Sequence, residues 1–259
     1  MAKVAWISVA PVKGLALLQR EGIVLEPFGV AENRRFYLVD ERGTLVNGKR
    51  LGPLVRVVPE YDETAGTLTF HLPDDEVVSG EVELGAQIVT TFYGRPVKGR
   101  LVEGPWSDAL STLSGTRLTL AQTEELGAGP DRGSRAGVSL VSTASLDALA
   151  QAAGTDGRVD GRRFRMLFGV DGTAAHEEDE WIGRRVAIGE AVVRPRGNVG
   201  RCAVTTQNPD TGRPDFDTLR VLGSYRGSVP TTERLPFGVW GEVVEPGKVR
   251  LGDEVTPAG

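Results

Sequence analysis

The only cysteine of the chain lies in a segment whose composition favours a chemically reactive site. A thiolate is the best nucleophile and the softest metal ligand among the side chains, and neighbouring cations stabilise it. Three arginines and two glycines precede Cys202: Arg194, Arg196, Gly197, Gly200 and Arg201. The glycines let the backbone approach a ligand closely. A lone cysteine can equally be a small buried apolar residue, so the composition leaves both interpretations open.

Basic residues beside glycines and turns form a second group of candidates. They are Lys13 with its neighbour Gly14, Arg34, Arg50, Arg163, Arg165 and Arg201, and two hydroxyls follow the cysteine at Thr205 and Thr206. An unpaired guanidinium is costly inside a sheet, so arginines in or beside expected strands are candidates for binding an anion. Arginines that converge on a phosphate make bidentate, charge-assisted hydrogen bonds. One soft ligand with several anion-binding side chains indicates a phosphorylated cofactor that carries a metal.

Other familiar chemistries lack their residues. The two histidines, His71 and His176, have no zinc-type spacing with each other or with Cys202. The acidic run at 177–180 that follows His176 is expected to be a solvated turn. The sequence contains no nucleophile elbow, no P-loop and no GxGxxG fingerprint. Typical hydrolase, NTPase and dinucleotide-binding functions are therefore not supported.

The composition limits the partners and the compartment. The chain has 259 residues and a formal net charge of -5, which argues against non-specific binding to nucleic acid. One cysteine cannot form an intramolecular disulfide, and no run approaches the eighteen or so apolar residues of a membrane span. The N-terminal segment is too short and too polar for a signal peptide. We expect a cytoplasmic protein with neither a nucleic-acid nor a membrane partner.

The elements that must position these residues are mainly short strands. Runs rich in β-branched and aromatic residues alternate with Gly- or Pro-bearing turns, a pattern typical of antiparallel sheets or barrels. Apolar spacing predicts helices over 106–113, over 143–153 and over 215–222, and Ser142 or Thr143 is suited to cap the second. The segments 164–170 and 202–206 are expected to be strands or strand ends. The Gly-rich stretch 127–134 is the best candidate boundary, so we expect domains over 1–125 and 126–259.

Several segments together resemble one known family. Residues 10–14, APVKG, resemble its YPVKS segment, and residues 33–40, NRRFYLVD, resemble its DRRWMLVD strand. Residues 200–212, GRCAVTTQNPDTG, resemble its most specific signature, xRCxxTTxDPDTG. The chain thus resembles, over nearly its whole length, the MOSC family (the C-terminal domain of molybdenum cofactor sulfurase) preceded by its N-terminal β-barrel partner.

The resemblance implies a fold and a cofactor. It implies a mainly-β protein in which a β-barrel MOSC domain follows a β-barrel-like N-terminal domain, with few short helices. The family's second half binds a pterin-based molybdenum cofactor (Mo-molybdopterin) through the signature cysteine, which makes Cys202 the expected metal ligand and catalytic centre. Further residues are expected to hold the pterin and its phosphate: Lys13, Gly14, Arg34, Arg50, Arg163, Arg165, Arg201, Thr205 and Thr206.

The implied activity is that of the family's amidoxime-reducing branch. Such an oxidoreductase reduces N-hydroxylated or otherwise N-oxygenated small molecules. The sequence carries no cysteine cluster for an iron–sulfur centre, so electrons are expected from a separate ferredoxin- or flavin-type protein. Two alternatives stay open. Cys202 could carry sulfur or the molybdenum cofactor for transfer, or the scaffold could serve binding or biosynthesis without molybdenum.

Four positions depart from the family's motifs. Gly14 stands where the family commonly has serine, Leu167 where it has asparagine, and Asn33 and Asn208 where it has aspartate. Each change removes a hydroxyl, an amide or a charge. Each is expected to weaken cofactor binding or to alter the substrate pocket.

Overall fold

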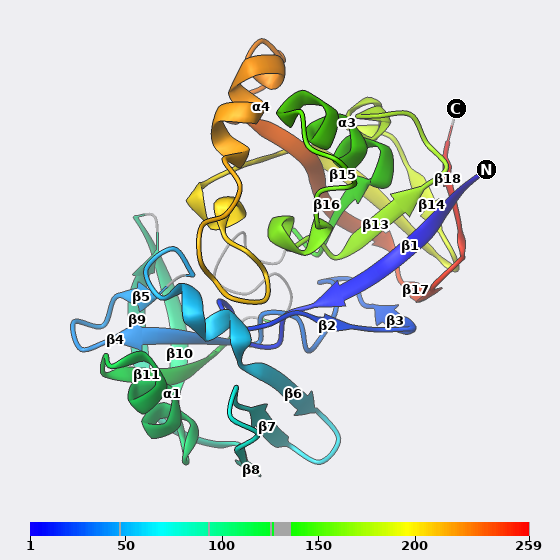
Figure 1. Cartoon of the computed structure of the whole chain (residues 1–259). Helices are drawn as coiled ribbons and strands as arrows, with labels where there is room; N and C mark the ends of the chain where they lie inside the picture. Colours follow the sequence, from blue (N-terminus) through cyan, green and yellow to red (C-terminus); the bar gives the residue numbers. More distant parts are fainter. Residues whose placement is uncertain (47, 93, 125, 127–135, 259) are drawn as a thin grey trace.

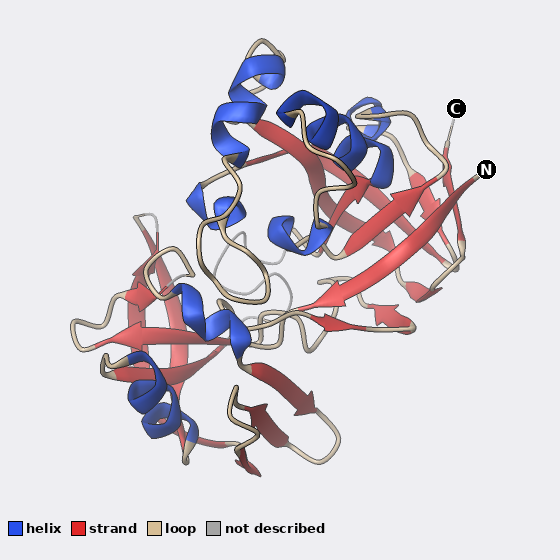
Figure 2. Cartoon of the chain, viewed as in Figure 1, coloured by secondary structure: helices blue, strands red, loops and turns tan. Residues whose placement is uncertain are grey.

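Strands dominate the computed structural model, which describes residues 1–258 except 47, 93, 125 and 127–135. Figure 2 shows two groups of strands, with helices over the outer side of each. Both groups are built largely from antiparallel pairs, which confirms the prediction of a mainly-β protein with few short helices. No helix in the described part of the chain is long and apolar enough to cross a membrane.

The larger group is a closed barrel of seven strands. Their order is β13-β12-β16-β15-β14-β18-β1, and pairing of β13 with β1 closes the ring. The strands are β1 (Ala2–Val9), β12 (Val138–Ser142), β13 (Phe168–Asp171), β14 (Val186–Ile188), β15 (Ala191–Gly200), β16 (Pro236–Glu245) and β18 (Glu254–Pro257). Their inward side chains, among them Ile7, Phe168 and Val239, are fully buried and form one core. Closure leaves no free edge, so every barrel strand has two partners.

The barrel takes its first strand from the N-terminus of the chain. β1 pairs with β13 through Ile7 and Phe168 and with β18 through Ala2 and Val255 (Figure 1). A short strand, β2 (Leu18–Gln19), pairs antiparallel with the end of β1. The strand β3 (Gly22–Leu25) pairs with β17 (Gly247–Arg250). The expected boundary at 125/126 and the Gly-rich stretch beside it lie outside the described residues. The division into domains at that point stays a prediction.

The smaller group consists of two antiparallel sheets over a second core. One has the order β5-β4-β11-β10-β9 and the other the order β6-β7-β8. Their bounds are β4 (Phe36–Asp40), β5 (Leu45–Val46), β6 (Val58–Asp62), β7 (Thr67–His71), β8 (Val77–Glu81), β9 (Glu83–Phe92), β10 (Arg95–Glu103) and β11 (Leu118–Thr123). Trp106 fills the space between the sheets and donates from Nε1 to the carbonyl of Leu68 at 3.1 Å. The indole ring is thus buried in the apolar core while its N–H group makes a hydrogen bond.

The predicted helices form, with one displaced. α1 (Trp106–Ser114) and α3 (Thr143–Ala153) confirm their predictions, and the side chain of Ser142 caps α3 by accepting from the amide of Ser145 at 3.0 Å. α4 (Thr218–Arg226) begins three residues later than expected. Asp217 caps it by accepting from the amide of Arg220, so the helix cannot start at 215.

Two expected strands were wrong in part or whole. Residues 203–206 form a 3-10 turn, η4 (Ala203–Thr206), because the amide and hydroxyl of Thr205 both donate to the carbonyl of Cys202 at 3.0 Å. In the 164–170 segment, only β13 from Phe168 onward is a strand. A preceding 3-10 turn, η2 (Gly161–Phe164), is started by Asp160, whose side chain accepts from the amide of Arg162. Local hydrogen bonds thus replaced sheet pairing in both places.

The acidic run after His176 is not the solvated turn that we expected. It forms η3 (Glu177–Trp181), in which Glu178 and Trp181 are each only 1% exposed. The carboxylate of Glu178 accepts from the hydroxyl of Ser145 at 2.8 Å and from the amide of Ser142 at 3.3 Å. The turn therefore packs against the start of α3 and contributes Trp181 to the barrel core.

Candidate active site

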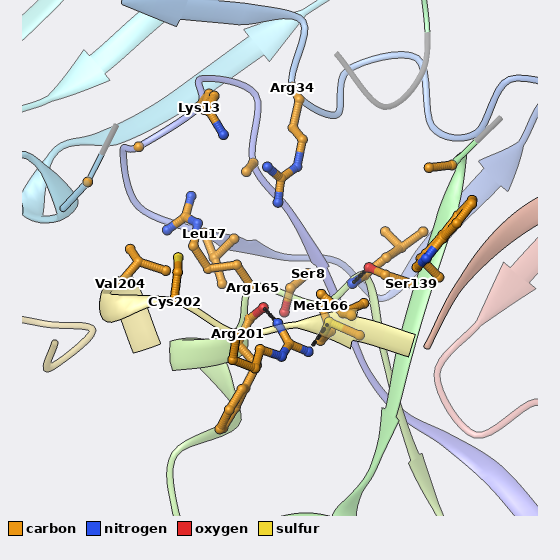
Figure 3. Close-up of a pocket in the computed structure, with 18 of the residues that line it drawn as sticks. Ser8, Lys13, Leu17, Arg34, Ser139, Arg165, Met166, Arg201, Cys202 and Val204 are labelled. Atoms are coloured by element: carbon orange, nitrogen blue, oxygen red, sulfur yellow. Dashed lines mark hydrogen bonds between the residues drawn. The ribbon is translucent and has the colours of Figure 1, made fainter. Parts of the chain in front are cut away.

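A cavity of about 570 Å³ lies where the barrel meets the smaller group of strands. Its wall combines residues of the first half of the chain, in segments 8–17, 33–34, 48–55 and 92–95, with residues of the second half, chiefly 136–139, 164–167 and 199–207. Cys202 lies on this wall, directly after β15 (Figure 3). We call this space the Cys202 cavity.

The Cys202 side chain is held at a fixed point of the wall. Its backbone is extended, with φ of -134° and ψ of 176°, while its carbonyl accepts the two bonds from Thr205 that start η4. Cys202 is a free, half-buried thiol. Figure 3 shows its sulfur directed to the side of the cavity where Lys13 and Arg165 lie. The thiol is thus both accessible from the cavity and close to cations.

Positive charge dominates the cavity wall. Among the described residues, the wall carries one carboxylate, Glu233, and six cationic residues: Lys13, Arg34, Lys49, Arg95, Arg165 and Arg201. This excess exists although the whole chain has a net charge of -5. A concave surface with such an excess attracts and concentrates anions.

The cations of the cavity affect one another. Burial lowers the pKa of Lys13 well below its ordinary value, and the nearby charges of Arg34 and Arg165 lower it further. Burial likewise lowers the pKa of Arg165 to about 10. Arg165 donates from Nη2 to the carbonyl of Leu15 at 2.8 Å, which holds its guanidinium in place. A bound anion would compensate these buried positive charges and offset the repulsion between them.

Arg201 contributes mainly to the construction of the site. Its Nε donates to the carbonyl of Phe237 at 2.9 Å, its Nη1 to the carbonyl of Phe164 at 3.0 Å, and its Nη2 contacts both the Phe237 carbonyl and the sulfur of Met166. The guanidinium also lies over the Phe164 ring. Arg201 therefore ties the residue before the cysteine to β16 and to η2.

The segment 48–52 from the first half of the chain braces the cysteine loop. Gln207 donates from Nε2 to the carbonyl of Gly48 at 2.9 Å. Gly52 and Gly212 lie so close that a Cβ on either would overlap the carbonyl oxygen of the other. Glycine is required at these two positions because backbone meets backbone there.

The structure brings six of the predicted site residues to the cavity and leaves four beside it. Lys13, Gly14, Arg34, Arg165, Arg201 and Cys202 line the Cys202 cavity. Arg50 instead bonds the carboxylate of Asp40 at 2.9 Å, and Arg163 binds the carboxylate of Asp215. The hydroxyls of Thr205 and Thr206 donate to the main-chain carbonyls of Cys202 and Ala203 and thereby stabilise the turn η4.

Other lining residues escaped the sequence analysis. Lys49 precedes Arg50, the predicted residue of the same segment, and its side chain lines the cavity. Phe92 and Arg95 lie at the facing ends of β9 and β10, and the Nζ of Lys13 is 4.8 Å from the centroid of the Phe92 ring. No local pattern marks these two residues, since only the tertiary structure brings this hairpin to the cavity.

The four departures from the family's motifs are integrated into the structure. Asn33 accepts from the amide of Ala10 at 2.9 Å, and Leu167 is 2% exposed in the barrel core. Asn208 accepts from the amides of Asp210 and Thr211, and its Nδ2 donates to Asp215 at 2.8 Å. An aspartate at 208 could not make that last bond. Gly14 has a φ of +94°, a conformation that suits glycine.

A metal ion held in this cavity by the described residues would need further ligands from another molecule. The described part of the chain contains no group of three or more His, Cys, Asp or Glu side chains that could hold a metal ion. A single thiolate does not complete the coordination of a metal. The cationic wall beside the thiol fits a group that brings both negative charge and its own metal ligands.

Comparisons with known proteins agree with this architecture. The family model for the MOSC domain matches residues 126–256, and that for the MOSC N-terminal beta barrel domain matches residues 1–99. Mitochondrial amidoxime-reducing component 1 of Mus musculus is 34% identical over 122 residues, which are 45% of this chain and 35% of that protein. Molybdenum cofactor sulfurase of Drosophila willistoni is 23% identical over 246 residues, 90% of this chain and 30% of that protein.

Both relatives are much longer than the matched segments, which span about a third of their lengths. Among solved structures, the YUAD protein from Bacillus subtilis aligns over 98% of this chain and 93% of its own, with a TM-score of 0.45 and 14% sequence identity. The family resemblance predicted from the motifs is confirmed. The chain belongs to the MOSC domain family and is a distant relative of the amidoxime-reducing components and of molybdenum cofactor sulfurase.

Proposed function

We propose that the protein is a molybdenum cofactor-dependent oxidoreductase that reduces N-oxygenated small molecules. The observation that supports this most directly is the position of Cys202, a half-buried thiol on the wall of a cavity that carries six cationic residues and one carboxylate. A soft ligand beside concentrated positive charge suits a metal that arrives on a phosphorylated organic group.

Each part of the cavity has a role in this proposal. Cys202 ligates the molybdenum, while Lys13, Arg34 and Arg165 bind the anionic part of the cofactor. Arg201 keeps the cysteine loop attached to the barrel through its bonds to Phe237 and Phe164. The bound cofactor supplies the redox chemistry, in which an N-hydroxylated compound takes up two electrons and two protons and yields the reduced compound and water. A separate ferredoxin- or flavin-type protein donates the electrons.

The first experiment measures the molybdenum-to-protein ratio by elemental mass spectrometry. Wild type, Cys202→Ser and Ala203→Ser are purified from a host that makes the cofactor. Ala203 is the exposed neighbour of Cys202 and serves as the matched control. We expect near-stoichiometric metal in wild type and in Ala203→Ser, and a loss of at least about ten-fold in Cys202→Ser, with reduction of benzamidoxime lost in parallel. A wild type without molybdenum would overturn the proposal.

One observation favours a second candidate. The match to molybdenum cofactor sulfurase extends over 90% of the chain, twice the share matched by amidoxime-reducing component 1. In this alternative Cys202 carries sulfur, as a persulfide, or holds the cofactor for transfer. Intact-protein mass spectrometry after incubation with a persulfide donor separates the two. A stable +32 Da adduct on wild type but not on Cys202→Ser, without benzamidoxime reduction, would favour the carrier.

A further inference from the structure

A second pocket of about 340 Å³ adjoins the Cys202 cavity. Five residues, Leu17, Val55, Arg165, Val204 and Gln207, line both spaces and therefore form the wall between them. Val204 is two residues from Cys202, and Figure 3 shows Leu17, Arg165 and Val204 grouped next to the cysteine. The second pocket therefore adjoins the part of the Cys202 cavity that lies next to the thiol. Its volume is within the range of small-molecule sites.

The charges of the second pocket are largely compensated. Arg162 donates to Asp160 at 2.6 Å and to Asp210 at 2.7 Å, and Arg163 forms a bidentate pair with Asp215 at 2.6 and 2.9 Å. The Cys202 cavity, in contrast, has one carboxylate on a wall with six cations. Arg56 and Arg165 also line the second pocket, so four arginines there face the three carboxylates of Asp160, Asp210 and Asp215. The excess of positive charge is therefore smaller than in the Cys202 cavity, and a polyanion is favoured in the Cys202 cavity.

One side of the second pocket is apolar. Ala16, Val58 and Pro73 face it from the smaller group of strands and the chain that leads to it, and Leu17, Val55 and Val204 continue this surface into the shared wall. The rest of the lining is mostly polar and includes Asn208, Asp210 and four arginines. An apolar surface with a few polar groups on one side is typical of a site for a small organic molecule.

The shared wall contains both fixed and movable parts. Arg165 is held by the carbonyl of Leu15, and Gln207 by the carbonyl of Gly48. Leu17, Val55 and Val204 are half-buried apolar side chains, whose rotamers can change rapidly. A ligand can therefore pass the wall on its apolar part without breaking a hydrogen bond.

We infer that the second pocket binds the apolar body of a neutral substrate, such as an aryl group, while its N-oxygenated head passes the wall toward Cys202. This inference rests on the proposed reductase function and adds a substrate class to it. It assigns the charged cofactor and the neutral substrate to separate spaces. An anionic substrate would compete with the cofactor for the Cys202 cavity, and a neutral one would not.

Ala16→Phe tests the assignment, because Ala16 lines only the second pocket and a phenyl group there fills it. Ala187→Phe, at an exposed position of β14, is the matched control. We expect the KM for benzamidoxime to rise about ten-fold or more in Ala16→Phe, with molybdenum content unchanged. Hydroxylamine, which has no apolar body, should react at a rate within two-fold of wild type.

Ligand-observed NMR supplies a readout that does not depend on turnover. Saturation transfer to benzamidoxime is expected for wild type and Ala187→Phe, and is expected to be lost in Ala16→Phe and in a second filling variant, Pro73→Phe. Equal saturation transfer in wild type and in a folded filling variant would overturn the inference. Binding that the filling variants abolish, without turnover of either compound by wild type, would support the pocket and overturn the reductase proposal instead.

Discussion

The Cys202 cavity and the second pocket share a wall, but the arginines that line them differ in their partners. Arg163 and Arg165 are two residues apart in the chain. Arg163 is 9% exposed and paired with the carboxylate of Asp215, whereas Arg165 reaches the carbonyl of Leu15 and adds its charge to that of Lys13. The number of arginines therefore does not locate an anion site. An arginine that is paired with a carboxylate, such as Arg163, has little charge left to attract an anion.

The backbone between the two residues explains their different surroundings. Arg163 lies within η2, while Arg165 follows it in the left-handed conformation, with a φ of +52°. A non-glycine residue in this conformation is uncommon and reverses the local direction of the chain. The strain places Arg165 in the wall between both spaces, and strain of this kind is typical of functional sites.

The largest expected effect comes from exchanging the two arginines for alanine, one at a time. Arg165→Ala should lower the molybdenum content of the folded protein at least about ten-fold, because it removes a buried cation from the anion site. Its thermal stability should change little. Arg163→Ala should leave the molybdenum content within two-fold but lower the unfolding free energy by about 2–3 kcal/mol, since it removes the charged partner of Asp215 and the bond to the carbonyl of Gln207.

Elemental analysis and urea denaturation measure these two quantities on the same preparations. The comparison would fail if both variants lost metal to the same extent. It would also fail if Arg165→Ala were destabilised while retaining its molybdenum.

An intermediate effect is expected at the contact that braces the cysteine loop. Gly212→Ala should lower the unfolding free energy by about 2 kcal/mol and reduce molybdenum content several-fold, because the new Cβ overlaps the carbonyl of Gly52. Gly43→Ala is the matched control, since Gly43 has the same φ of +70° but nothing within 4 Å of the new Cβ. Equal behaviour of the two variants would show that the backbone conformation, rather than the contact, sets the cost.

The smallest effect concerns His176, a half-buried histidine whose pKa is lowered. Burial, with a further contribution from Arg226, lowers the pKa of His176 to about 4, and among the described residues neither ring nitrogen has a hydrogen-bond partner. Between pH 6.5 and about 4 the unfolded chain takes up a proton that the folded chain refuses, so stability falls as the pH falls through this window.

Wild type should lose unfolding free energy between pH 7 and pH 4.5, and His176→Gln should reduce this loss by on the order of 2 kcal/mol, as measured by denaturation at both pH values. His71→Gln is the control, because His71 is 45% exposed on β7 beside Glu60. Curves of the same shape for wild type and His176→Gln would remove His176 as the cause. The loss of stability at acid pH would then be attributed to paired carboxylates with lowered pKa values, such as Asp215.

Local signals explain what could be predicted. The cap of α3 joins Ser142 to Ser145, its end lies at Gly154 with a φ of +67°, and α1 ends in the same way at Gly115. These interactions span a few residues, so the sequence pattern contains them completely. The candidate reactive residue was equally easy to identify locally, because Cys202 is the single cysteine of the chain and stands in a specific motif.

The composition and motifs by themselves determined the mainly-β class, the cap of α3, the family and the position of the single thiol. Only the tertiary structure decided which cations accompany that thiol, because charge compensation acts between residues far apart in the chain. Arg163 meets Asp215 across 52 positions, and Arg165 meets Leu15 across 150. The same holds for β1, whose place in the barrel depends on Phe168 and Val255 rather than on its neighbours in sequence. Burial and pairing are properties of the folded chain, and they separate a binding cation from a structural one.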